Sequence, residues 1–572
     1  MKNNLLNDPS PYLQQHKKNP VFWQTWNKEI LNLAKKQKKP ILLSIGYASC
    51  HWCHVMAHES FEDDETAKIM NDYFINVKVD REERPDIDFI FQSSYQLFNQ
   101  SSGGWPLTMF LDENGAPFMG GTYFPKDEQN GLPSFKIVLK KINETYQQQR
   151  EKIINQSNFV KQNLELKKNS VVGQEFEPIL DSLIKNLDEI KGGYKGSPKF
   201  PTFNIYDTLI YFYNKSKKEK YLKPIELILD KLCSQGIYDH VEGGISRYTV
   251  DENWLIPHFE KMLYDNVQFI SLLSKYLKIK PNKYFESKAE ETIGFLNSNF
   301  VNKNNYLLGS AYDADSDGEE GKYYIYKYEE IKNIKDINKF YEVNPEGNWE
   351  GKIILRELHK EPPDYIKKEL LEIRKKRNKP FFDDKTQLDL NSLWLSSLIS
   401  ANNVLPNNDY LKLSEKYFNL IEKKFCELSL FHSYSKEIVF IEDYAYFIQA
   451  LLDLYDSTMN IKYKIKAKEL CNLAIEKFFL YKKNIFQKNE ILSNDLFMSP
   501  IDISDHTIPN GNSVMLLNFT RLGMLDEGNK LSESLNGYLN IYKSYMVSSL
   551  KSLDYFNLIK NGKNCNFDGC KI

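Results

Sequence analysis

The sequence Pro40-Ile41-Leu42-Leu43-Ser44-Ile45, followed by Cys50-His51-Trp52-Cys53, decides the fold of the first part of this chain. An apolar, strand-like run leads into two cysteines separated by two residues, and residues 55–73 then have helical periodicity. This arrangement is the active-site pattern of a thioredoxin-like redox fold. The unpaired amides and the dipole at a helix N-terminus stabilise a thiolate. The stretch therefore predicts a dithiol site in which Cys50 attacks and Cys53 resolves.

The segments around this motif alternate between strand-like and helix-like patterns over residues 1–165. Such alternation predicts a central sheet with helices packed on it, which makes this part an α/β thioredoxin-like domain. A charged helix and a linker are expected over 130–170. The predicted helices are 21–39, 60–73 and 86–97, and the predicted strands are 41–45, 74–80, 106–111 and 117–120.

A second feature supports the dithiol interpretation. Trp105-Pro106 opens a predicted strand after Ser101-Ser102-Gly103-Gly104. Thioredoxin-like folds place a cis-proline at this point, facing the CxxC turn, and only an X-Pro bond adopts cis readily. Pro106 is therefore the third candidate residue of the redox site.

The same motif permits three other chemistries. His51, His54 and His58 lie beside Cys50 and Cys53, so a zinc site of cysteine and histidine ligands is an alternative. Cys50-x-x-Cys53-His54 also matches the c-type haem attachment pattern. Haem attachment takes place outside the cytoplasm and no export signal is visible, which disfavours it. Two buried, inert thiols are the structural alternative. We expect no cofactor, with zinc as the alternative.

Composition narrows the class of protein. The chain has 572 residues, 41% of them hydrophobic, which describes a folded protein of several domains. With 75 basic and 77 acidic residues it lacks the basic footprint of a nucleic-acid-binding protein. No apolar stretch is long enough to cross a bilayer, and the N-terminus lacks the apolar core of a secretory signal. We therefore expect a cytoplasmic protein with no nucleic-acid or membrane partner. Seven cysteines argue against a disulfide framework.

Residues 175–572 have a different pattern, in which long helical runs dominate. Their number, about a dozen at ordinary helix and loop lengths, fits a closed ring of helical hairpins, an (α/α)6 barrel. A helical solenoid is the alternative, but no regular short repeat supports it. The predicted helices are 176–191, 203–213, 224–236, 259–277, 284–300, 388–403, 410–426, 443–457, 465–479 and 512–521.

Short sequence blocks that match a known family occur in the same order along nearly the whole chain. Two of them are Gly103-Gly104-Trp105-Pro106-Leu107 and Pro257-His258-Phe259-Glu260-Lys261. The others are residues 10–16, 44–62, 78–86, 198–201, 243–248, 262–266, 313–316, 319–321, 442–445 and 511–513. With these blocks the chain resembles the family of the spermatogenesis-associated thioredoxin-domain protein and its bacterial relatives. The resemblance implies a thioredoxin-like domain, 1–165, joined to a barrel of the six-hairpin glycosidase or acylglucosamine-epimerase type, 175–572.

The chain departs from the family pattern at three positions. Leu390 stands before Asn391 where the family has tryptophan, and Asn510 stands where it has serine. Ala57 replaces an acidic residue. The first two positions fall at expected barrel ends, so they bear on barrel chemistry more than on the fold.

Polar residues in the second half form another candidate site. His258 and Glu260 are expected to open a helix after Pro257, with Glu260 and Tyr264 on one face and Asp265 a turn later. Polar clusters at one set of helix ends form a cleft in α/α-barrels. The alternative is that these residues cap helices and form ion pairs.

An acidic loop adds further candidates. The stretch from Asp313 to Gly321 contains five carboxylates, of which Asp313 and Asp315 are the candidate catalytic residues. Paired carboxylates perform general acid–base work on a glycosidic bond. Paired histidines, such as His258 and His506, move a proton at a sugar carbon in the similar epimerase barrels. A solvated turn or a calcium loop is the alternative, although Tyr324 stands where the terminal glutamate of an EF-hand belongs.

Three functional hypotheses follow. The first is thiol–disulfide exchange by Cys50 and Cys53 with a protein disulfide or a small thiol, coupled to a barrel that binds or modifies a carbohydrate. The second is a sugar epimerase or glycosidase whose CxxC domain is regulatory or structural. The third is a non-enzymatic binding module that holds zinc. The first two would make the protein an enzyme.

Overall fold

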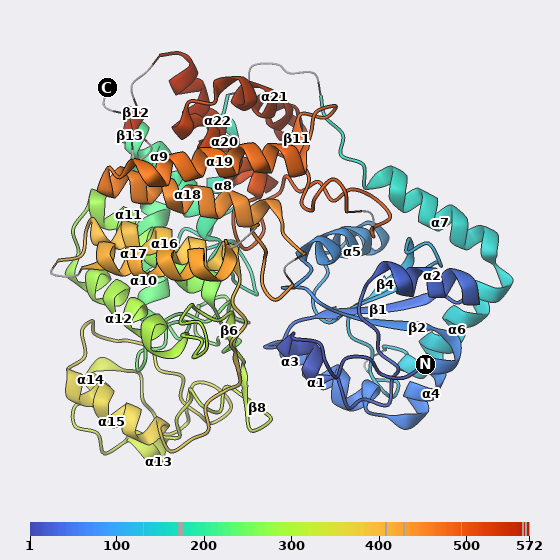
Figure 1. Ribbon diagram of the computed structural model, residues 1–572. Helices are drawn as coiled ribbons and strands as arrows, with labels where there is room; N and C mark the ends of the chain where they lie inside the picture. The colour runs from blue at the N-terminus through green and yellow to red at the C-terminus, as the bar shows by residue number, and fades with distance from the viewer. Residues whose placement is uncertain are drawn as a thin grey trace. The chain divides into compact units, whose positions relative to one another are not determined.

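A computed structural model describes residues 1–129, 131–169, 175–406, 409–426, 429–435, 437–493 and 495–562, with short strands at 565–566 and 569–570. The chain forms two compact units (Figure 1). The first unit comprises Met1–Lys167, Ser433–Ser435 and Gln487–Ile501. The second unit comprises Lys168–His432, Lys436–Phe486 and Asp502–Ile572.

The first unit contains a sheet of four strands in its described part, in the order β2-β1-β3-β4. β1 pairs in parallel with β2 and antiparallel with β3, and β3 pairs antiparallel with β4. All residues of β1 are buried, as its continuous apolar run predicts for a central strand. The strands are β1 Ile41–Gly46, β2 Ile75–Asp80, β3 Leu107–Leu111 and β4 Pro117–Gly121.

Helices pack on this sheet, and the thioredoxin-like architecture is confirmed. One core joins α2 and α5 to the sheet, with Ala34, Ile87 and Phe91 buried against Leu43 and Val77. The helices are α1 Pro11–Gln15, α2 Lys28–Gln37, α3 His51–Met56, the π-turn η1 Ala57–Phe61, α4 Asp64–Tyr73, α5 Pro85–Asn99, α6 Phe135–Gln148 and α7 Arg150–Asn163.

Two predicted helix starts were too early, and side-chain caps explain both. The Asn27 side chain accepts a hydrogen bond from the Ile30 amide, so α2 begins at Lys28. Gln24 instead forms a parallel bridge with Val77 at the sheet edge. The Asp63 side chain accepts from the Thr66 amide and starts α4 at Asp64. Residues 57–61, which precede that cap, continue α3 as a π-turn.

A segment from far along the chain completes the first unit. Leu496, Phe497 and Met498 pack against its core. The Phe497 and Phe91 rings have centroids 5.9 Å apart. Arg84 donates to Asp495 at 2.8 Å while its guanidinium also binds Asp86 through two nitrogens. The sequence pattern gave no sign that residues 487–501 belong to this unit.

The second unit is an (α/α)6 barrel, as predicted. In its described part, six inner helices contact one another in sequence order, and the last contacts the first, which closes the ring. The inner helices are α9 Phe203–Ser216, α11 Leu263–Ile279, α16 Leu388–Asn402, α18 Ile441–Thr458, α20 Gly511–Leu522 and α22 Val547–Lys560. The outer helices are α8 Glu177–Lys185, α10 Glu219–Ser234, α12 Lys283–Asn299, α17 Tyr410–Phe425, α19 Ile461–Phe478 and α21 Leu525–Tyr542.

An insertion between α12 and α16 has its own small core, built around Tyr326, Tyr341 and Leu370. Its helices are α13 Tyr328–Ile331, α14 Ile337–Phe340 and α15 Asp364–Arg374. The short strands of this unit are β5 Lys261–Met262, β6 Ala311–Tyr312, β7 Asp315–Ser316, β8 Glu319–Glu320, β9 Phe382–Asp383, β10 Phe479–Leu480, β11 Ile485–Phe486, β12 Cys565–Asn566 and β13 Gly569–Cys570. The 3-10 turn η2 spans Lys543–Tyr545.

The inner helices begin at one end of the barrel, because each outer helix returns the chain to that end. Backbone bonds link the segments there: the Leu263 amide donates to Ser310, and the Leu388 amide donates to His432. The loops that enter the inner helices therefore carry the barrel's polar clusters.

Candidate functional sites

The two cysteines of the motif form a disulfide in the structure, with their Cα atoms 5.2 Å apart. Cys50 is the N-cap of α3, and its sulfur accepts a hydrogen bond from the Cys53 amide at 3.2 Å. Both cysteines are nearly buried, whereas Trp52 between them is 49% exposed. The strand-to-helix turn thus presents the pair beneath one exposed aromatic ring.

Pro106 lies where the sequence predicts. The Trp105–Pro106 peptide is cis, and Pro106 directly precedes β3. The register pairs Ile45 with Leu107, so Pro106 stands opposite Gly46 at the end of β1. A Cβ added to Gly46 would lie 2.7 Å from the Cys53 sulfur, so glycine lets the strand approach the disulfide closely.

Sequence reasoning missed a buried amine, that of Lys78, which lies on β2 opposite Ser44 of β1. Lys78 is buried, and burial lowers the pKa of its amine well below the ordinary value. Its Nζ donates to the Ser44 hydroxyl at 3.0 Å and lies 4.4 Å from the Phe61 ring centroid. The buried Tyr12 hydroxyl, which has no hydrogen-bond partner in the described part of the chain, would be 2.3 Å from the same added Cβ of Gly46. A lysine inside an apolar strand was the available signal.

The histidines proposed as zinc ligands are placed differently from one another. His51 and His54 are partly buried on α3, and the two rings of His51 and Trp52 meet edge to face. His58 is exposed and its Nδ1 lies 3.1 Å from Glu62. Both cysteine sulfurs are used in the disulfide, so a zinc site here would need the reduced dithiol. Zinc at this motif stays a prediction.

In the barrel, the prediction that His258 and Glu260 open a helix is wrong. They lie in the loop before β5, and α11 begins at Leu263. Glu260 and Tyr264 therefore do not share a helical face. A bond from the Arg247 amide to the Glu260 carbonyl holds this loop in an irregular path.

The predicted barrel residues contact several different partners. His258 Nδ1 lies 2.8 Å from Glu320, and the buried Glu260 accepts from Arg247 at 2.8 Å. Asp265 is buried in the first turn of α11. His506 is exposed and lies 3.4 Å from Asp502, so His258 and His506 contact different carboxylates.

The acidic stretch from Asp313 to Gly321 forms a hairpin. β7 and β8 pair antiparallel, and Asp317 and Gly318 make the turn with φ of 52° and 74°. Positive φ at both turn positions is typical of a type I′ hairpin. Asp313, which is buried, accepts from the Asp315 amide at 3.1 Å. The loop therefore has the hydrogen-bonded geometry of a hairpin turn, and it brings Glu320 to His258.

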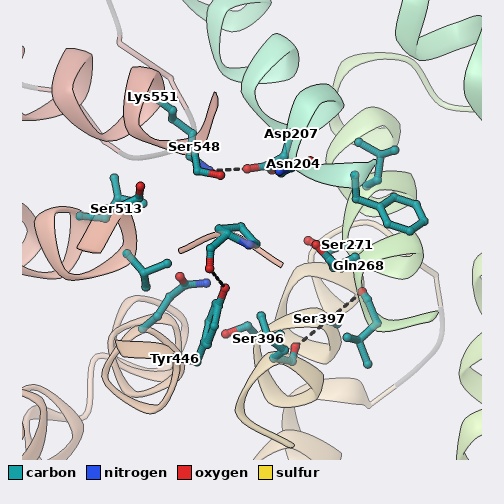
Figure 2. A pocket seen from close by; sticks show the side chains of 18 of the residues that line it. Asn204, Asp207, Gln268, Ser271, Ser396, Ser397, Tyr446, Ser513, Ser548 and Lys551 are labelled. Atoms are coloured by element: carbon teal, nitrogen blue, oxygen red, sulfur yellow. Dashed lines mark hydrogen bonds and ion pairs between the residues drawn. The ribbon is translucent and has the colours of Figure 1, made fainter. Parts of the chain in front are cut away.

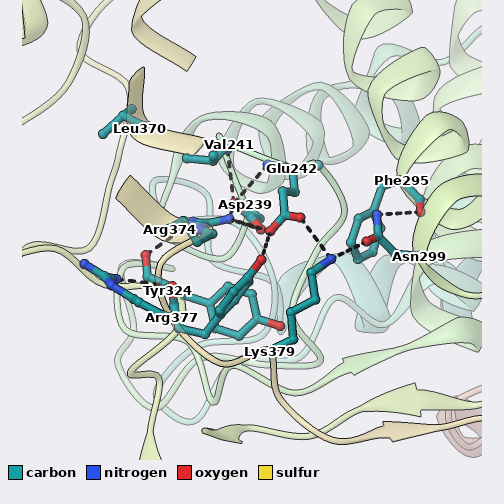
Figure 3. A network of polar contacts seen from close by, with 12 residues as sticks. Asp239, Val241, Glu242, Phe295, Asn299, Tyr324, Leu370, Arg374, Arg377 and Lys379 are labelled. Atoms are coloured by element: carbon teal, nitrogen blue, oxygen red, sulfur yellow. Dashed lines mark hydrogen bonds and ion pairs between the residues drawn. The ribbon is translucent and has the colours of Figure 1, made fainter. Parts of the chain in front are cut away.

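A buried ion network joins residues of the insertion to residues of a barrel loop (Figure 3). Arg374 of α15 donates to both oxygens of Asp239 at 2.8 Å, and Lys261 donates to the same carboxylate at 2.7 Å. Burial alone would raise the pKa of Asp239, but Arg374 and Lys261 hold it well below the ordinary value. Arg374 also reaches Glu242 at 3.2 Å. The network ties the insertion to the barrel loops.

A second barrel cluster contains residues that no sequence motif indicates together as a site. Among the described residues, one group of potential ligand side chains has its atoms within 4.8 Å of one another, namely Asp389, His432 and Asp443. The pKa of Asp389 is raised to about 7, chiefly by burial and also by the charge of Asp443, although His432 lowers it. The three residues are far apart in sequence, so no local pattern indicates the group, although Asp443 lies in the block of residues 442–445.

A cavity of about 90 Å³ lies among the inner helices (Figure 2). Most of its wall surface is apolar, and the polar side chains that line it include Asn204, Gln268, Ser396 and Tyr446. The buried Ser396 hydroxyl has no hydrogen-bond partner within the described residues. A wider hollow of about 510 Å³ shares Ser396 with it.

Among the helices described, none is long and apolar enough to span a membrane.

The fold and the disulfide define a thioredoxin-like unit joined to a six-hairpin α/α-barrel. A family model described as "Protein of unknown function, DUF255", named Thioredox_DsbH, matches residues 2–165. The chain is 31% identical to Uncharacterized protein B0495.5 of Caenorhabditis elegans, over 94% of this chain and 82% of that protein. It is 30% identical to spermatogenesis-associated protein 20 of Rattus norvegicus, over 91% of this chain and 75% of that protein. The chain belongs to the spermatogenesis-associated protein 20 family.

Solved structures are similar to each part separately. Cellobiose 2-epimerase from Bacillus thermoamylovorans B4167 matches 65% of this chain and 86% of its own, with 13% identity and a TM-score of 0.43. A chain titled DsbH Oxidoreductase matches 23% of this chain and 86% of its own, with 18% identity and a TM-score of 0.18.

Proposed function

We propose that Cys50 and Cys53 exchange disulfides with a protein or a small thiol. The observation that carries this proposal is the disulfide across the first turn of α3, with Cys50 as the N-cap. The register that sets Pro106 opposite Gly46 adds support, because it places the cis-proline beside the cysteine turn.

The exchange follows from ordinary thiol chemistry. The reduced Cys50 thiolate attacks a substrate disulfide, forms a mixed disulfide and releases one substrate thiolate. The Cys53 thiolate then attacks the Cys50 sulfur and releases the second substrate thiolate. The substrate gains two electrons and the protein gains the Cys50–Cys53 bond. The reverse sequence oxidises a dithiol, so the partner's potential sets the direction.

Insulin reduction by the full chain, with dithiothreitol as the electron source, tests this function. Cys50→Ser should abolish the activity, and Cys53→Ser should accumulate the mixed disulfide. Cys426→Ser is the matched control, because burial raises the pKa of that thiol to about 11 and keeps it protonated. Activity that persists in Cys50→Ser would contradict the proposal.

A glutathione redox titration of the same protein separates this function from the zinc module. A measurable Cys50–Cys53 couple supports exchange. Stoichiometric zinc on the reduced pair, with no measurable couple, would support the module instead.

For the barrel we infer a second function, the binding of a carbohydrate. The cavity in Figure 2 supports it, because hydroxyl and amide groups line a confined space and the Ser396 hydroxyl lacks an internal partner. Such groups match sugar hydroxyls, and orphaned ones favour a ligand that bonds to them.

Calorimetric titration with mono- and disaccharides tests this inference. Ser396→Ala should weaken binding about 5- to 10-fold, the effect of one hydrogen bond. Ser287→Ala on the outer helix α12 is the control. Equal affinities in the two variants would contradict it.

Sugar turnover that persists in Cys50→Ser would favour an epimerase or glycosidase with a regulatory CxxC domain.

A further inference from the structure

Three buried side chains meet where two neighbouring inner helices begin. Asp389 is in the first turn of α16, Asp443 is in the first turn of α18, and His432 lies in the loop before α18. Their exposed fractions are 8%, 0% and 2%, respectively. His432 Nδ1 and Asp443 Oδ1 are 2.8 Å apart.

Two acidic side chains share one imidazole in this group. Within the described residues, neither Asp389 nor Asp443 pairs with a lysine or an arginine. The Leu390 amide donates to Asp389 at 2.8 Å, and the Phe440 amide donates to Asp443 at 2.9 Å. Two other buried carboxylates of the barrel do pair with such a cation, Asp239 with Arg374 and Asp383 with Lys385. Burying two carboxylates beside a single imidazole is unfavourable unless a further positive charge balances them.

We propose that Asp389, His432 and Asp443 bind a divalent transition-metal ion such as Mn²⁺ or Zn²⁺. One imidazole nitrogen and two carboxylate oxygens form the mixed donor set that suits these ions, whereas Ca²⁺ takes oxygen alone. Two ligands at about 2.1 Å from an ion lie about 3 Å apart, close to the separation of the Nδ1–Oδ1 pair. The site has no part in the thiol chemistry proposed above.

The neighbouring side chains hold the imidazole ring for this task. His432 Nε2 lies 3.2 Å from the Gln387 amide nitrogen, and the Ser310 hydroxyl donates to the Gln387 amide oxygen at 3.3 Å. When Nδ1 binds an ion, the imidazole proton resides on Nε2, and the Gln387 amide turns to present its oxygen. Such outer contacts orient metal-binding histidines. The ion would also tie the first turns of α16 and α18 together.

The test uses the full chain carrying Cys50→Ser and Cys53→Ser, so that the motif thiols cannot take the metal. After EDTA treatment and dialysis, Mn²⁺ is titrated and the free ion is followed by electron paramagnetic resonance. Zn²⁺ is measured separately by elemental analysis. We expect one equivalent of ion per chain and a higher Tm on binding. This readout does not depend on redox activity, so its failure is distinct from failure of the proposed function.

Two near-isosteric variants make the test specific. Asp389→Asn and His432→Gln should each weaken binding by at least about 10- to 100-fold. His506→Gln, which removes an exposed imidazole paired with Asp502, should leave binding unchanged. Circular dichroism of the ion-free variants checks folding, and His432→Gln decides the result if Asp389→Asn does not fold. No stoichiometric binding, or equal binding in all variants, would overturn the proposal.

Discussion

The two units build their sites over very different sequence distances. In the thioredoxin-like unit, Cys50 and Cys53 share one helical turn, and Pro106 reaches them through a neighbouring strand. In the barrel, Asp239 bonds to Arg374, which is 135 residues further along the chain. Asp389 and Asp443, which lie at the starts of two different helices, come together in one cluster. A site built from residues close together in sequence, which we call local, can be recognised as a sequence motif. A site built from distant residues, which we call assembled, depends on the closed ring that positions its loops.

The largest expected effect is in the assembled network. Asp239→Asn leaves Arg374 and Lys261 buried without their carboxylate, and we expect the barrel's free energy of unfolding to fall by about 3–5 kcal/mol. Urea denaturation measures the change. Asp230→Asn, which breaks the exposed pair with Lys360, is the matched control and should change stability by less than about 1 kcal/mol. Equal losses in both variants would show that the barrel does not depend on the network.

Acid should weaken the barrel through Glu357. This carboxylate is buried and bonds His240, Lys288 and Tyr284. Burial raises its pKa, but His240 and Lys288 overcome this and lower it to about 2. A depressed pKa stabilises the fold above the ordinary value of 4.5, so about 3 kcal/mol is lost as pH falls from 4.5 to 2.

Urea denaturation of the wild type and Glu357→Gln at several pH values isolates this contribution. The difference in stability between the two proteins should shrink as pH falls through that range. A stability difference between the two proteins that stays constant from neutral pH to pH 2 would show that protonation of Glu357 does not cause the loss of stability in acid.

A smaller effect is expected at the local site. Gly46→Ala places a Cβ 2.3 Å from the Tyr12 hydroxyl and 2.7 Å from the Cys53 sulfur, so one of them must move. Overpacking of this kind costs about 1–3 kcal/mol. We expect a lower Tm of the first unit and slower insulin reduction. Gly294→Ala on α12, where an added Cβ meets nothing within 4 Å and φ is not positive, is the control for the loss of a glycine without overpacking.

The smallest expected effect is a helix cap in the first unit. Asp63→Ala removes the acceptor of the Thr66 amide at 2.9 Å and should cost about 1 kcal/mol. Hydrogen bonds from Lys126 and Thr66 lower the pKa of Asp63 to about 2, so the cost should shrink as pH falls from the ordinary value of 3.8 to 2. Denaturation of the wild type and the variant at pH 7 and pH 2 measures it. A cost equal to that of Asp239→Asn would erase the contrast between the units.

The sequence predicts the fold well and the barrel site only in part. Apolar runs locate β1 to β3 within a residue, because alternation and turn residues are local signals. Pro106 could be predicted because a proline directly before a strand is recognisable in the sequence itself. His258 and Glu260 were assigned to a helix because periodicity does not reveal that the His258 amide donates to Tyr248 and that the Glu260 carbonyl accepts from Arg247. Asp389 and His432 carry no local signal, since only ring closure brings them together.

The return of residues 487–501 to the first unit has a consequence for synthesis. A ribosome adds about 5–20 residues per second, so tens of seconds pass between the emergence of Lys167 and of Phe497. During that interval the nascent first unit exposes the apolar surface around Phe91 that Phe497 later covers. A chaperone that binds exposed aromatic surface would find its target there, and it would be released when the returning segment arrives.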